Sequence, residues 1–261
     1  MKIKFYKYEG TGNDFILIDN RDKKLKVKNP ELWKRLCDRH FGIGADGLML
    51  IQNKKGYDFE MVYFNADGNE STMCGNGGRC IAHLAKKLDI VKGKSTSFIA
   101  IDGKHEAEFG NKHTVKLKMN DVKNIVEHTG FYTLNTGSPH YVTLVKDIME
   151  IDVRSDGRSI RNCNAYKKEG INVNFVEVLG KKIMLRTYER GVEDETLSCG
   201  TGTVAAALVL AGKGLATAKD HCDIQTMGGT LRVWFTKEKD GFKNIWLEGP
   251  ATYVFSGSYK I

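Results

Sequence analysis

Residues 199–203 read Cys199-Gly200-Thr201-Gly202-Thr203, and the apolar run Val204-Ala-Ala-Ala-Leu-Val-Leu-Ala211 follows directly. The run is apolar on every face, which predicts a helix that is buried on all sides. Cys199 then stands at the start of that helix, where backbone N–H groups have no partner within the helix and the helix dipole is positive. This setting favours a thiolate, because such cysteines fall from a free pKa of about 8.5 into the range of roughly 3.5 to 7.5.

The first half of the chain holds a second copy of this pattern. Cys74-Gly75-Asn76-Gly77-Gly78 also places a cysteine before paired glycines, and apolar residues at helical spacing follow. The two cysteines lie 125 positions apart, and so do Thr11-Gly12 and Thr136-Gly137. We therefore interpret the chain as two copies of one unit. A duplicated unit predicts two equivalent helix starts at one cleft, with two thiols on opposite sides of the same small molecule.

Strand patterns dominate both copies, and each copy has one strongly apolar helix. These features predict an α+β fold with two pseudo-symmetric domains, each a mainly antiparallel sheet curled around a central helix. We expect a half that carries Cys74 and a half that carries Cys199. The predicted boundaries are residues 1–122 with 251–261 for the first half and residues 123–250 for the second.

Composition narrows the class of protein. The 261 residues are 41% apolar and 28% charged, which is typical of a soluble globular protein. The net charge of +8 comes from scattered lysines without a dense basic block, so we do not expect a nucleic-acid partner.

No apolar run approaches the roughly 20 residues that span a membrane, and the first residues lack a signal-peptide pattern. These patterns predict a cytoplasmic protein without a membrane partner. The six cysteines contain no Cys-x2-Cys pair, so no zinc site is expected.

The cysteine motifs and the residues before them resemble the diaminopimelate epimerase family. Asn65-Ala-Asp-Gly68 precedes the first motif, and Glu189-Arg190-Gly191 precedes the second. Three further segments are similar to that family and extend the resemblance over nearly the whole chain: Gly10–Phe15, Gly42–Gly47 and Val173–Phe175. The resemblance implies interconversion of LL- and meso-diaminopimelate without a cofactor, in lysine and cell-wall precursor synthesis. It also implies a homodimer. The molecule that the enzyme would bind is diaminopimelate, a small amino acid.

The resemblance also assigns roles to residues. It implies that Cys74 and Cys199 exchange the α-proton of the substrate, one as thiolate base and the other as thiol acid. His140 and Glu189 match residues that adjust the cysteine pKa values or contact the substrate. Arg190 is suited to a bidentate grip on the distal carboxylate. The full set of implied substrate-binding residues is Asn13, Asn65, Gly75, Asn76, Asn174, Glu189, Arg190, Gly200 and Thr201.

Two of these assignments agree with elementary chemistry, and one position departs from the family pattern. Backbone N–H groups at the two helix starts would stabilise the charge that develops on the substrate carboxylate. The glycines fit this role because nothing larger lets the backbone approach so closely.

Many family members have Asn-Pro-His where this chain has Ser138-Pro139-His140. A hydroxyl thus replaces an amide, although Ser138 can still donate one hydrogen bond and accept others.

Other functions remain open from the residues alone. Proline racemases and hydroxyproline epimerases share the Cys-Gly-Thr-Gly turn, but a cyclic imino acid offers nothing for Arg190 to bind. A phenazine-biosynthesis-type isomerase would share the expected fold with a carboxylate-based site instead of paired cysteines. A pyridoxal-phosphate racemase has no sequence pattern that marks its lysine. A non-catalytic amino-acid binder would leave two thiols at matched helix starts unexplained.

Overall fold

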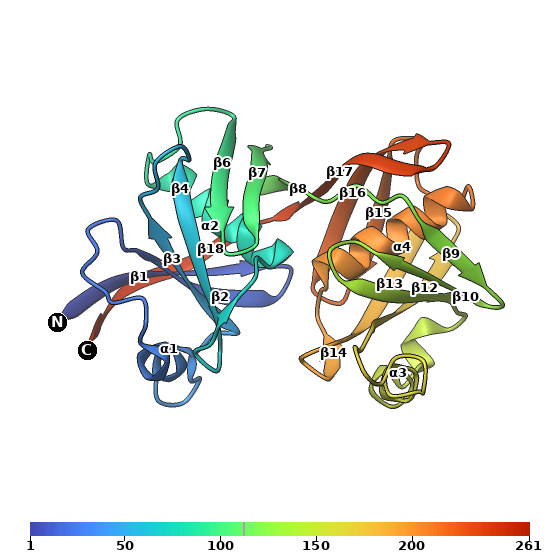
Figure 1. Cartoon of the computed structure of the whole chain (residues 1–261), viewed down its shortest axis with the longest axis horizontal. Coiled ribbons are helices and arrows are strands. Elements are labelled where there is room, and N and C mark those ends of the chain that lie inside the picture. The colour runs from blue at the N-terminus through green and yellow to red at the C-terminus, as the bar shows by residue number, and fades with distance from the viewer. Residues whose placement is uncertain (112) are drawn as a thin grey trace. The chain divides into compact units, whose positions relative to one another are not determined.

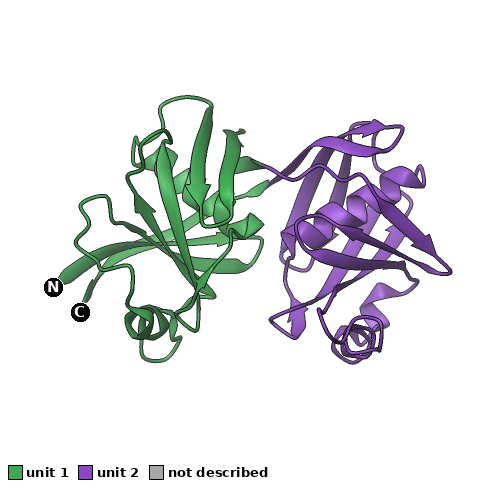
Figure 2. Cartoon of the chain, viewed as in Figure 1, with its two compact units in different colours: residues 1–117, 249–261 green, residues 118–248 purple. Residues whose placement is uncertain are grey.

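A computed structural model describes residues 1–111 and 113–261 of the chain (Figure 1). The chain divides into two compact units, which Figure 2 colours separately. Unit 1 comprises residues 1–117 and 249–261, and unit 2 comprises residues 118–248. Each unit is described by itself below.

Unit 1 contains a sheet and two helices. Its strands are β1 (Lys2–Gly10), β2 (Asn13–Asp19), β3 (Gly47–Gln52), β4 (Phe59–Asn65), β5 (Glu70–Ser71), β6 (Ser95–Ala100), β7 (Gly103–Phe109), β8 (Thr114–Lys118) and β18 (Thr252–Lys260). The helices are α1 (Pro30–Cys37) and α2 (Gly75–Lys87). The pairs β2·β3 and β4·β6 are parallel, whereas β1·β2, β3·β4, β6·β7 and β7·β8 are antiparallel.

Unit 2 repeats this arrangement. Its strands are β9 (Ile125–His128), β10 (Phe131–Asn135), β11 (Pro139–Leu144), β12 (Asn172–Leu179), β13 (Lys182–Glu189), β14 (Asp194–Thr196), β15 (His221–Thr226), β16 (Gly229–Glu238) and β17 (Gly241–Pro250). Its helices are the short η1 (Ile148–Glu150), α3 (Val153–Arg161) and α4 (Gly200–Gly212). The pairs β11·β12 and β13·β15 are parallel, and β10·β11, β12·β13, β15·β16 and β16·β17 are antiparallel.

The two units therefore share one pairing pattern, with a parallel pair at the same two places in each. Both central helices have 13 residues, and they begin 125 positions apart, at Gly75 and Gly200. The α+β class with mainly antiparallel sheets is confirmed, and the internal repeat that the cysteine motifs indicated extends to the order of strands.

Each sheet wraps around its central helix. Helix α4 packs against β10, β11, β12, β13, β15 and β16, and its residues from Val204 to Leu210 are at most 2% exposed (Figure 1). Helix α2 packs against β1, β2, β3 and β7. The unbroken apolar run of α4 is the cause of this burial, since a helix that is apolar all round has no face to give to water.

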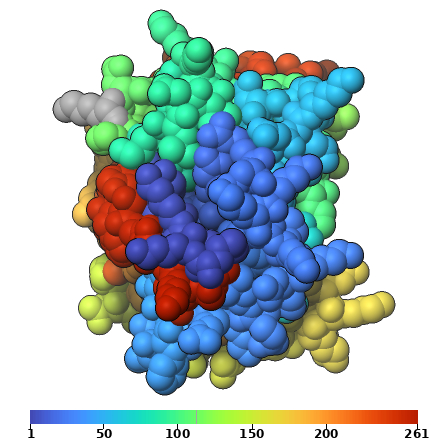
Figure 3. All heavy atoms as spheres, turned by 90° about the vertical axis from the view of Figure 1, so that its left-hand side faces the viewer, coloured from blue at the N-terminus to red at the C-terminus, as the bar shows by residue number. Residues whose placement is uncertain are grey.

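The last strand completes the first unit. Strand β18 pairs antiparallel with β1 from Lys2↔Lys260 to Glu9↔Thr252. Figure 3 shows the first strand in dark blue beside the last strand in red on the surface of unit 1. The two ends of the chain consequently meet, and the Met1 ammonium donates a hydrogen bond to the Ile261 carbonyl.

A second, outer helix covers each sheet. Pro30 is the first residue of α1, which buries Trp33 and Leu36, and Trp33 stacks on Phe64 with ring centroids 5.3 Å apart. In unit 2 the equivalent helix is α3, where Val153 packs among buried residues of β12 and β13. Within the described residues, the structure contains no helix with the length and apolar character needed to cross a membrane.

Helix α3 approaches its sheet so closely that it depends on Gly157. A Cβ atom at this position would lie 2.3 Å from the Cβ atom of Tyr188. Inside a helix, alanine is more favourable than glycine by about 1 kcal/mol, but overpacking of a core costs about 1–3 kcal/mol. We expect Gly157→Ala to lower the free energy of unfolding by about 1 kcal/mol or more in urea denaturation. The exposed Ser159→Ala on the same helix is the control and should not lower it. An unchanged or raised stability of Gly157→Ala would show that α3 can move outward without loss.

Candidate active site

Cys74 is the N-cap residue of α2 and lies with extended backbone (φ −96°, ψ 135°) at the helix start. Its carbonyl accepts the first helical hydrogen bond, from the Gly78 N–H at 2.7 Å. The thiol donates toward Asn13 Oδ1 with an Sγ···Oδ1 distance of 3.7 Å. The side-chain amide of Asn76 donates to the same oxygen at 3.4 Å. Three of the predicted site residues therefore meet in unit 1.

The orientation of the Asn13 amide is fixed from its other end. Its Nδ2 donates to Asp46 Oδ2 at 2.7 Å, so Oδ1 is the atom that faces Cys74 and Asn76. Asp46 in turn forms an ion pair with Arg39 at 2.6 Å. Sequence reasoning had singled out the loop Gly42–Gly47 but not the carboxylate within it. Asp46 directly precedes β3, whose first residue Gly47 is level with Phe15 of β2, so it is the pairing of these strands that brings Asp46 to Asn13.

A network of charges supports this arrangement behind Asn13. Asp14 pairs with Lys7 at 2.5 Å and with Arg39 at 2.7 Å. Burial raises the pKa of the Asp14 carboxyl, but the hydrogen bonds from Arg39 and Lys7 outweigh burial and hold the pKa at about 2. Asp14 is thus an anion throughout the physiological range, and Arg39 links it to Asp46.

Asn65 lies at the same edge of the unit 1 sheet. It is the last residue of β4 and is level with Gly47 in the antiparallel pair β3·β4. Its side chain is exposed, and its backbone closes a turn with hydrogen bonds to Asn69 and Gly68. The edge that begins β2 and β3 and ends β4 thus presents Asn13 and Asn65 together with the start of α2.

Cys199 repeats the position of Cys74 in unit 2. It is the N-cap residue of α4 (φ −109°, ψ 113°), is 6% exposed, and its carbonyl accepts from the Thr203 N–H at 2.9 Å. Its Sγ lies 3.6 Å from the Thr201 hydroxyl. A Cβ atom at Gly202 would lie 2.4 Å from Asn174 Oδ1 and 3.3 Å from Cys199 Sγ. The second glycine of the motif is therefore required by the closeness of β12 to the first turn of α4.

Glu189 ends β13 close to Cys199. Its carboxylate accepts a hydrogen bond from the Thr196 hydroxyl at 2.9 Å. Burial raises the pKa of Glu189, and hydrogen bonds from Thr196 and Cys199 lower it by less, so the pKa lies above its usual value. The Cys199 thiol thus has an acidic group with a raised pKa as its direct neighbour.

His140 is fully buried in β11 and is neutral. The Asn174 Nδ2 group lies 3.1 Å from His140 Nδ1, and because an amide NH2 group only donates, Nδ1 accepts and the ring proton is on Nε2. No described residue forms a hydrogen bond with Nε2. Burial, assisted by the positive charge of Arg190, lowers the pKa of His140 to about 3.

Asn174 itself has no exposed surface. Its Nδ2 donates to the Tyr141 carbonyl at 2.9 Å, and its Oδ1 accepts from the Thr187 hydroxyl at 3.0 Å. The substrate contact that the resemblance implies for Asn174 stays a prediction. In the structure, the partners of its amide are protein groups, and His140 is one of them.

Asn172, two residues earlier on the same face of β12, is a residue that sequence reasoning missed. Its Nδ2 donates to Ser138 Oγ at 2.8 Å, and its Oδ1 accepts from the Arg190 N–H at 2.9 Å. The Arg190 guanidinium is exposed, donates to the Glu169 carbonyl at 3.0 Å and reaches Ser138 Oγ at 3.4 Å. The strand alternation from Asn174 was the available signal, because residues two apart share a face.

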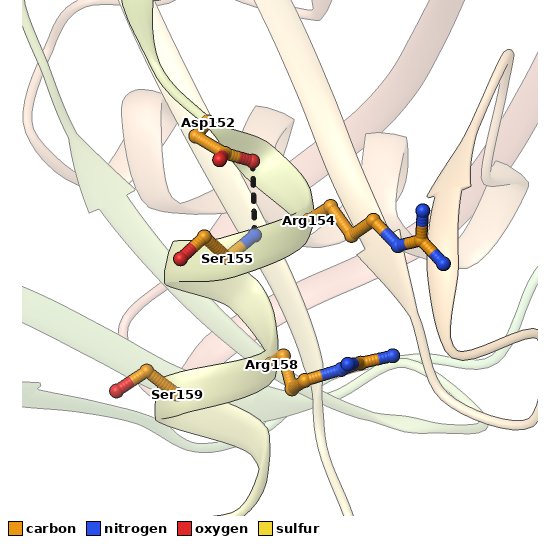
Figure 4. Close-up of a pocket in the computed structure, with 5 residues that line it drawn as sticks. All are labelled: Asp152, Arg154, Ser155, Arg158 and Ser159. Carbon is orange, nitrogen blue, oxygen red and sulfur yellow. Dashed lines mark hydrogen bonds between the residues drawn. The ribbon is translucent and has the colours of Figure 1, made fainter.

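A separate pocket lies on the surface of α3. Figure 4 shows Ser155 and Ser159 to the left of the helix and Arg154 and Arg158 extending to the right, with Asp152 accepting a hydrogen bond from the Ser155 N–H at 3.0 Å. Its lining residues are Asp152, Arg154, Ser155, Arg158 and Ser159, and none of them is a predicted site residue. Within the described part of the chain, no group of three or more His, Cys, Asp or Glu side chains is placed to hold a metal ion.

Comparison with known proteins gives a consistent assignment. A family model described as diaminopimelate epimerase matches residues 5–125 and 132–254. A diaminopimelate epimerase from Flavobacterium psychrophilum is 50% identical over 254 residues, covering 97% of this chain and 98% of the relative. One from Chlorobaculum tepidum is 41% identical over 256 residues, covering 95% and 98%. The chain belongs to the diaminopimelate epimerase family. It is therefore an enzyme, an epimerase of the isomerase class, and the resemblance inferred from the cysteine motifs is confirmed.

Solved structures show the same fold at low sequence identity. A phenazine biosynthesis protein of the PhzF family from Bacillus anthracis matches with a TM-score of 0.77 at 14% identity and covers 100% of both chains. A probable proline racemase from Agrobacterium radiobacter matches with a TM-score of 0.63 at 14% identity, covering 99% of this chain and 92% of that one. The diaminopimelate epimerase family thus shares its fold with proteins that are named for other functions, so the side chains of the site must decide the chemistry.

The contact at Gly202 makes a first prediction for the site. We expect Gly202→Ala to displace the Cys199 thiol or the Asn174 amide, and a misplacement of about 1 Å costs about 10²-fold in turnover. Epimerase activity measured on purified, folded protein provides the check. Gly212→Ala, at the other end of α4, is the control because its Cβ atom would have no neighbour within 4 Å. Equal activity of both variants would mean that the first turn of α4 can adjust without loss.

The buried His140 predicts a pH dependence of stability. Its pKa of about 3 lies below the ordinary 6.5, so as the pH falls through 6.5 the unfolded chain binds a proton that the folded chain does not. The contribution is therefore present above pH 6.5 and is lost as the pH falls, by up to about 1.4 kcal/mol per pH unit. We expect urea denaturation to show that wild type loses about 2 kcal/mol more than His140→Gln between pH 7 and pH 5. The exposed His128→Gln should behave as wild type; equal losses in all three proteins would contradict the assignment.

Proposed function

We propose that the chain catalyses the interconversion of LL- and meso-diaminopimelate, with Cys74 and Cys199 exchanging the α-proton without a cofactor. The observation that carries this proposal is the position of the two cysteines. Each is the N-cap of the central helix of its unit, in a chain that belongs to the diaminopimelate epimerase family. The names of the relatives supply the substrate, and the matched helix starts supply a reason for two thiols.

In the proposed mechanism, one cysteine acts as a base and the other as an acid. A thiolate takes the α-proton from one face of the substrate, so the C–H bond breaks and an S–H bond forms. The thiol of the other cysteine gives its proton to the opposite face, so its S–H bond breaks and a new C–H bond forms. The stereocentre is inverted, and the two cysteines have exchanged protonation states. The reverse reaction then starts from the state that the forward reaction leaves.

Backbone N–H groups of the two helix starts stabilise the negative charge that develops during proton removal. We propose that Gly75 and Asn76 from one helix, and Gly200 and Thr201 from the other, direct these groups at the substrate carboxylate. A helix start provides such donors without reorganisation, because the first turn is held by the rest of the helix. These hydrogen bonds accelerate the reaction because the carboxylate carries more negative charge in the transition state than in the bound substrate.

Other side chains bind the rest of the substrate. Asn13 and Asn65 offer amides at the edge of the unit 1 sheet, and we propose that they bind the amino-acid group that reacts. In unit 2 we propose that Arg190 binds the distal carboxylate, with Asn172 and Ser138 completing that part of the site. The hydrogen bonds of Asn172 to both of these residues support its inclusion.

His140, Asn174 and Glu189 act on Cys199 in this proposal. His140 remains neutral and so serves as a hydrogen-bond donor through Nε2, with Asn174 fixing the tautomer. Glu189 shares a hydrogen bond with Cys199 and modulates the ease with which the thiol loses its proton. We further propose, on the family resemblance alone, that the enzyme is a cytoplasmic homodimer serving lysine and cell-wall precursor synthesis.

The decisive experiment is a proton NMR time course in D2O with purified protein to which no cofactor has been added. We expect loss of the α-proton signal of LL-diaminopimelate, and no loss with L-proline or L-lysine. Cys74→Ala and Cys199→Ala should each slow the exchange by at least about 10²-fold, because each removes one of two groups that transfer protons. Cys163→Ala, which removes an exposed thiol, is the matched control and should exchange at the wild-type rate.

Each other result has a defined meaning. Exchange with proline in place of diaminopimelate would retain the two-thiol mechanism and reject the substrate. Wild-type rates in both cysteine variants would reject the mechanism while leaving the family assignment intact. No exchange with any of the three amino acids, from folded and reduced protein, would reject the proposed reaction.

A further inference from the structure

Arg79 is a fully buried cation on α2, close to Cys74 in the chain. Its guanidinium donates to four acceptors in unit 1, and all of them are neutral. They are the Gly75 carbonyl at 3.2 Å, Asn76 Oδ1 at 3.0 Å, Thr11 Oγ1 at 3.4 Å and the Pro250 carbonyl at 3.3 Å. None of the ion pairs found within residues 1–111 and 113–261 includes Arg79.

Packing does not explain a charge at this position. A buried cation without a counter-charge is costly, because the protein interior replaces its hydration poorly. The second repeat shows what the fold accepts instead: the residue 125 positions later in the equivalent helix is Val204, which is fully buried. An aliphatic side chain therefore fits this place in the fold. Arg79 is specific to the half of the enzyme that carries Cys74.

Three acidic groups interact with this charge, and Cys74 is the one among them whose protonation changes in the proposed reaction. The guanidinium interacts, in decreasing order, with Cys80, Cys74 and Glu9. Burial raises the pKa of the Cys80 thiol far above its usual value, so Cys80 stays neutral, and burial does the same for Tyr8 of β1. Glu9 has the weakest of the three interactions, and its carboxylate accepts from the Gly12 N–H at 3.0 Å.

Among the described residues of the other elements against α2, the acidic side chains are paired or exposed. Asp14 of β2 is already paired with Lys7 and Arg39, and β3 has no ionisable side chain. On β7, Glu106 pairs with Lys104, Glu108 is exposed, and His105 contacts Asp102 in the turn before the strand. A thiolate at Cys74 is thus the one negative charge near Arg79 that the proposed reaction itself creates and removes.

The hydrogen bonds of Arg79 also reach the thiol through two amides. Because Asn76 Oδ1 accepts from Arg79, its Nδ2 is directed at Asn13 Oδ1, the atom to which the Cys74 thiol donates. The Asn13 oxygen stabilises the protonated thiol, and the positive charge of Arg79 stabilises the thiolate. Cys74 must occupy both forms in each turnover, so opposing influences of this kind suit its role.

We propose that Arg79 is a positioning residue for Cys74. The buried positive charge of Arg79 stabilises the thiolate, and the N–H groups of its guanidinium hold the amides of Asn76 and Asn13 against the thiol. This inference rests on the proposed function only in taking Cys74 as a catalytic base. Its effect is confined to Cys74, because Val204 takes the equivalent place beside Cys199.

The test is the pH dependence of alkylation by iodoacetamide, read separately for each cysteine by peptide mass spectrometry on the full chain. In Arg79→Met and Arg79→Gln we expect the midpoint for Cys74 to rise by about one pH unit, since an opposite charge nearby has been removed. The midpoint for Cys199 should not move. Arg79→Lys keeps the charge and should keep the Cys74 midpoint near that of wild type. The exposed Arg158→Met carries the same change in net charge and should leave both midpoints in place.

The opposite outcomes overturn the inference. An unchanged Cys74 midpoint in folded Arg79→Met or Arg79→Gln would mean that Arg79 is merely structural, whatever happens to the melting temperature. If neither neutral variant folds, the alkylation midpoint of Cys74 in the wild-type protein is the test. A midpoint at or above the free-cysteine value of about 8.5 would contradict thiolate stabilisation. Alkylation needs no turnover, so a shifted midpoint together with a failed exchange assay would reject the proposed reaction and keep the role of Arg79.

Discussion

A buried helix must expose its first backbone N–H groups somewhere, and in both units that place is beside a cysteine. The first turn of an α-helix has donors that no carbonyl within the helix can satisfy. Here the N-cap residues are Cys74 and Cys199, and glycines follow them because strands approach the first turn closely. Burial of the rest of the helix by its sheet keeps this turn rigid. The strand ends, the asparagines and the charged network are arranged around it.

The sequence was most informative where the pattern is local. The cysteine-glycine turns, the apolar run of α4 and the 125-residue offset predicted two helix starts and a repeated α+β fold. The turns and the run depend on neighbouring residues only, and the offset is the recurrence of such short stretches. Helix α3 was not predicted, although it takes the place of α1 in the second repeat. It lacks the proline that opens α1 and carries Gly157 in its interior, so its local signal is weak, and its stability comes from packing on Tyr188.

The site could be predicted only in part, for a physical reason. Asp46 acts on Asn13 across the edge of a sheet, and Asn172 joins Ser138 to Arg190 because β11 and β12 are parallel and in register. Such contacts depend on strand pairing, which residue spacing does not contain. Asn174 shows the same limit from the other side. Alternation places it on one face with Asn172, and both residues are buried, so the spacing of residues does not distinguish the roles of the two amides.

The surroundings of the two cysteines share a backbone frame and differ in charge. The threonine of each repeated turn contacts the second residue of its helix, through Thr11 with Asn76 and Thr136 with Thr201. Beyond this frame, Cys74 interacts with the buried cation Arg79, whereas Cys199 shares a hydrogen bond with the carboxyl group of Glu189. A two-base reaction requires thiols in opposite protonation states, and identical surroundings would give both the same preference. Arg79 and Glu189 each cost folding stability because burial opposes their charged forms, and His140 costs stability because its buried Nε2–H has no partner among the described residues. The repeat itself shows that an apolar residue, Val204, is accepted at the place that Arg79 takes in unit 1, so the surroundings of the two cysteines differ at a cost in stability.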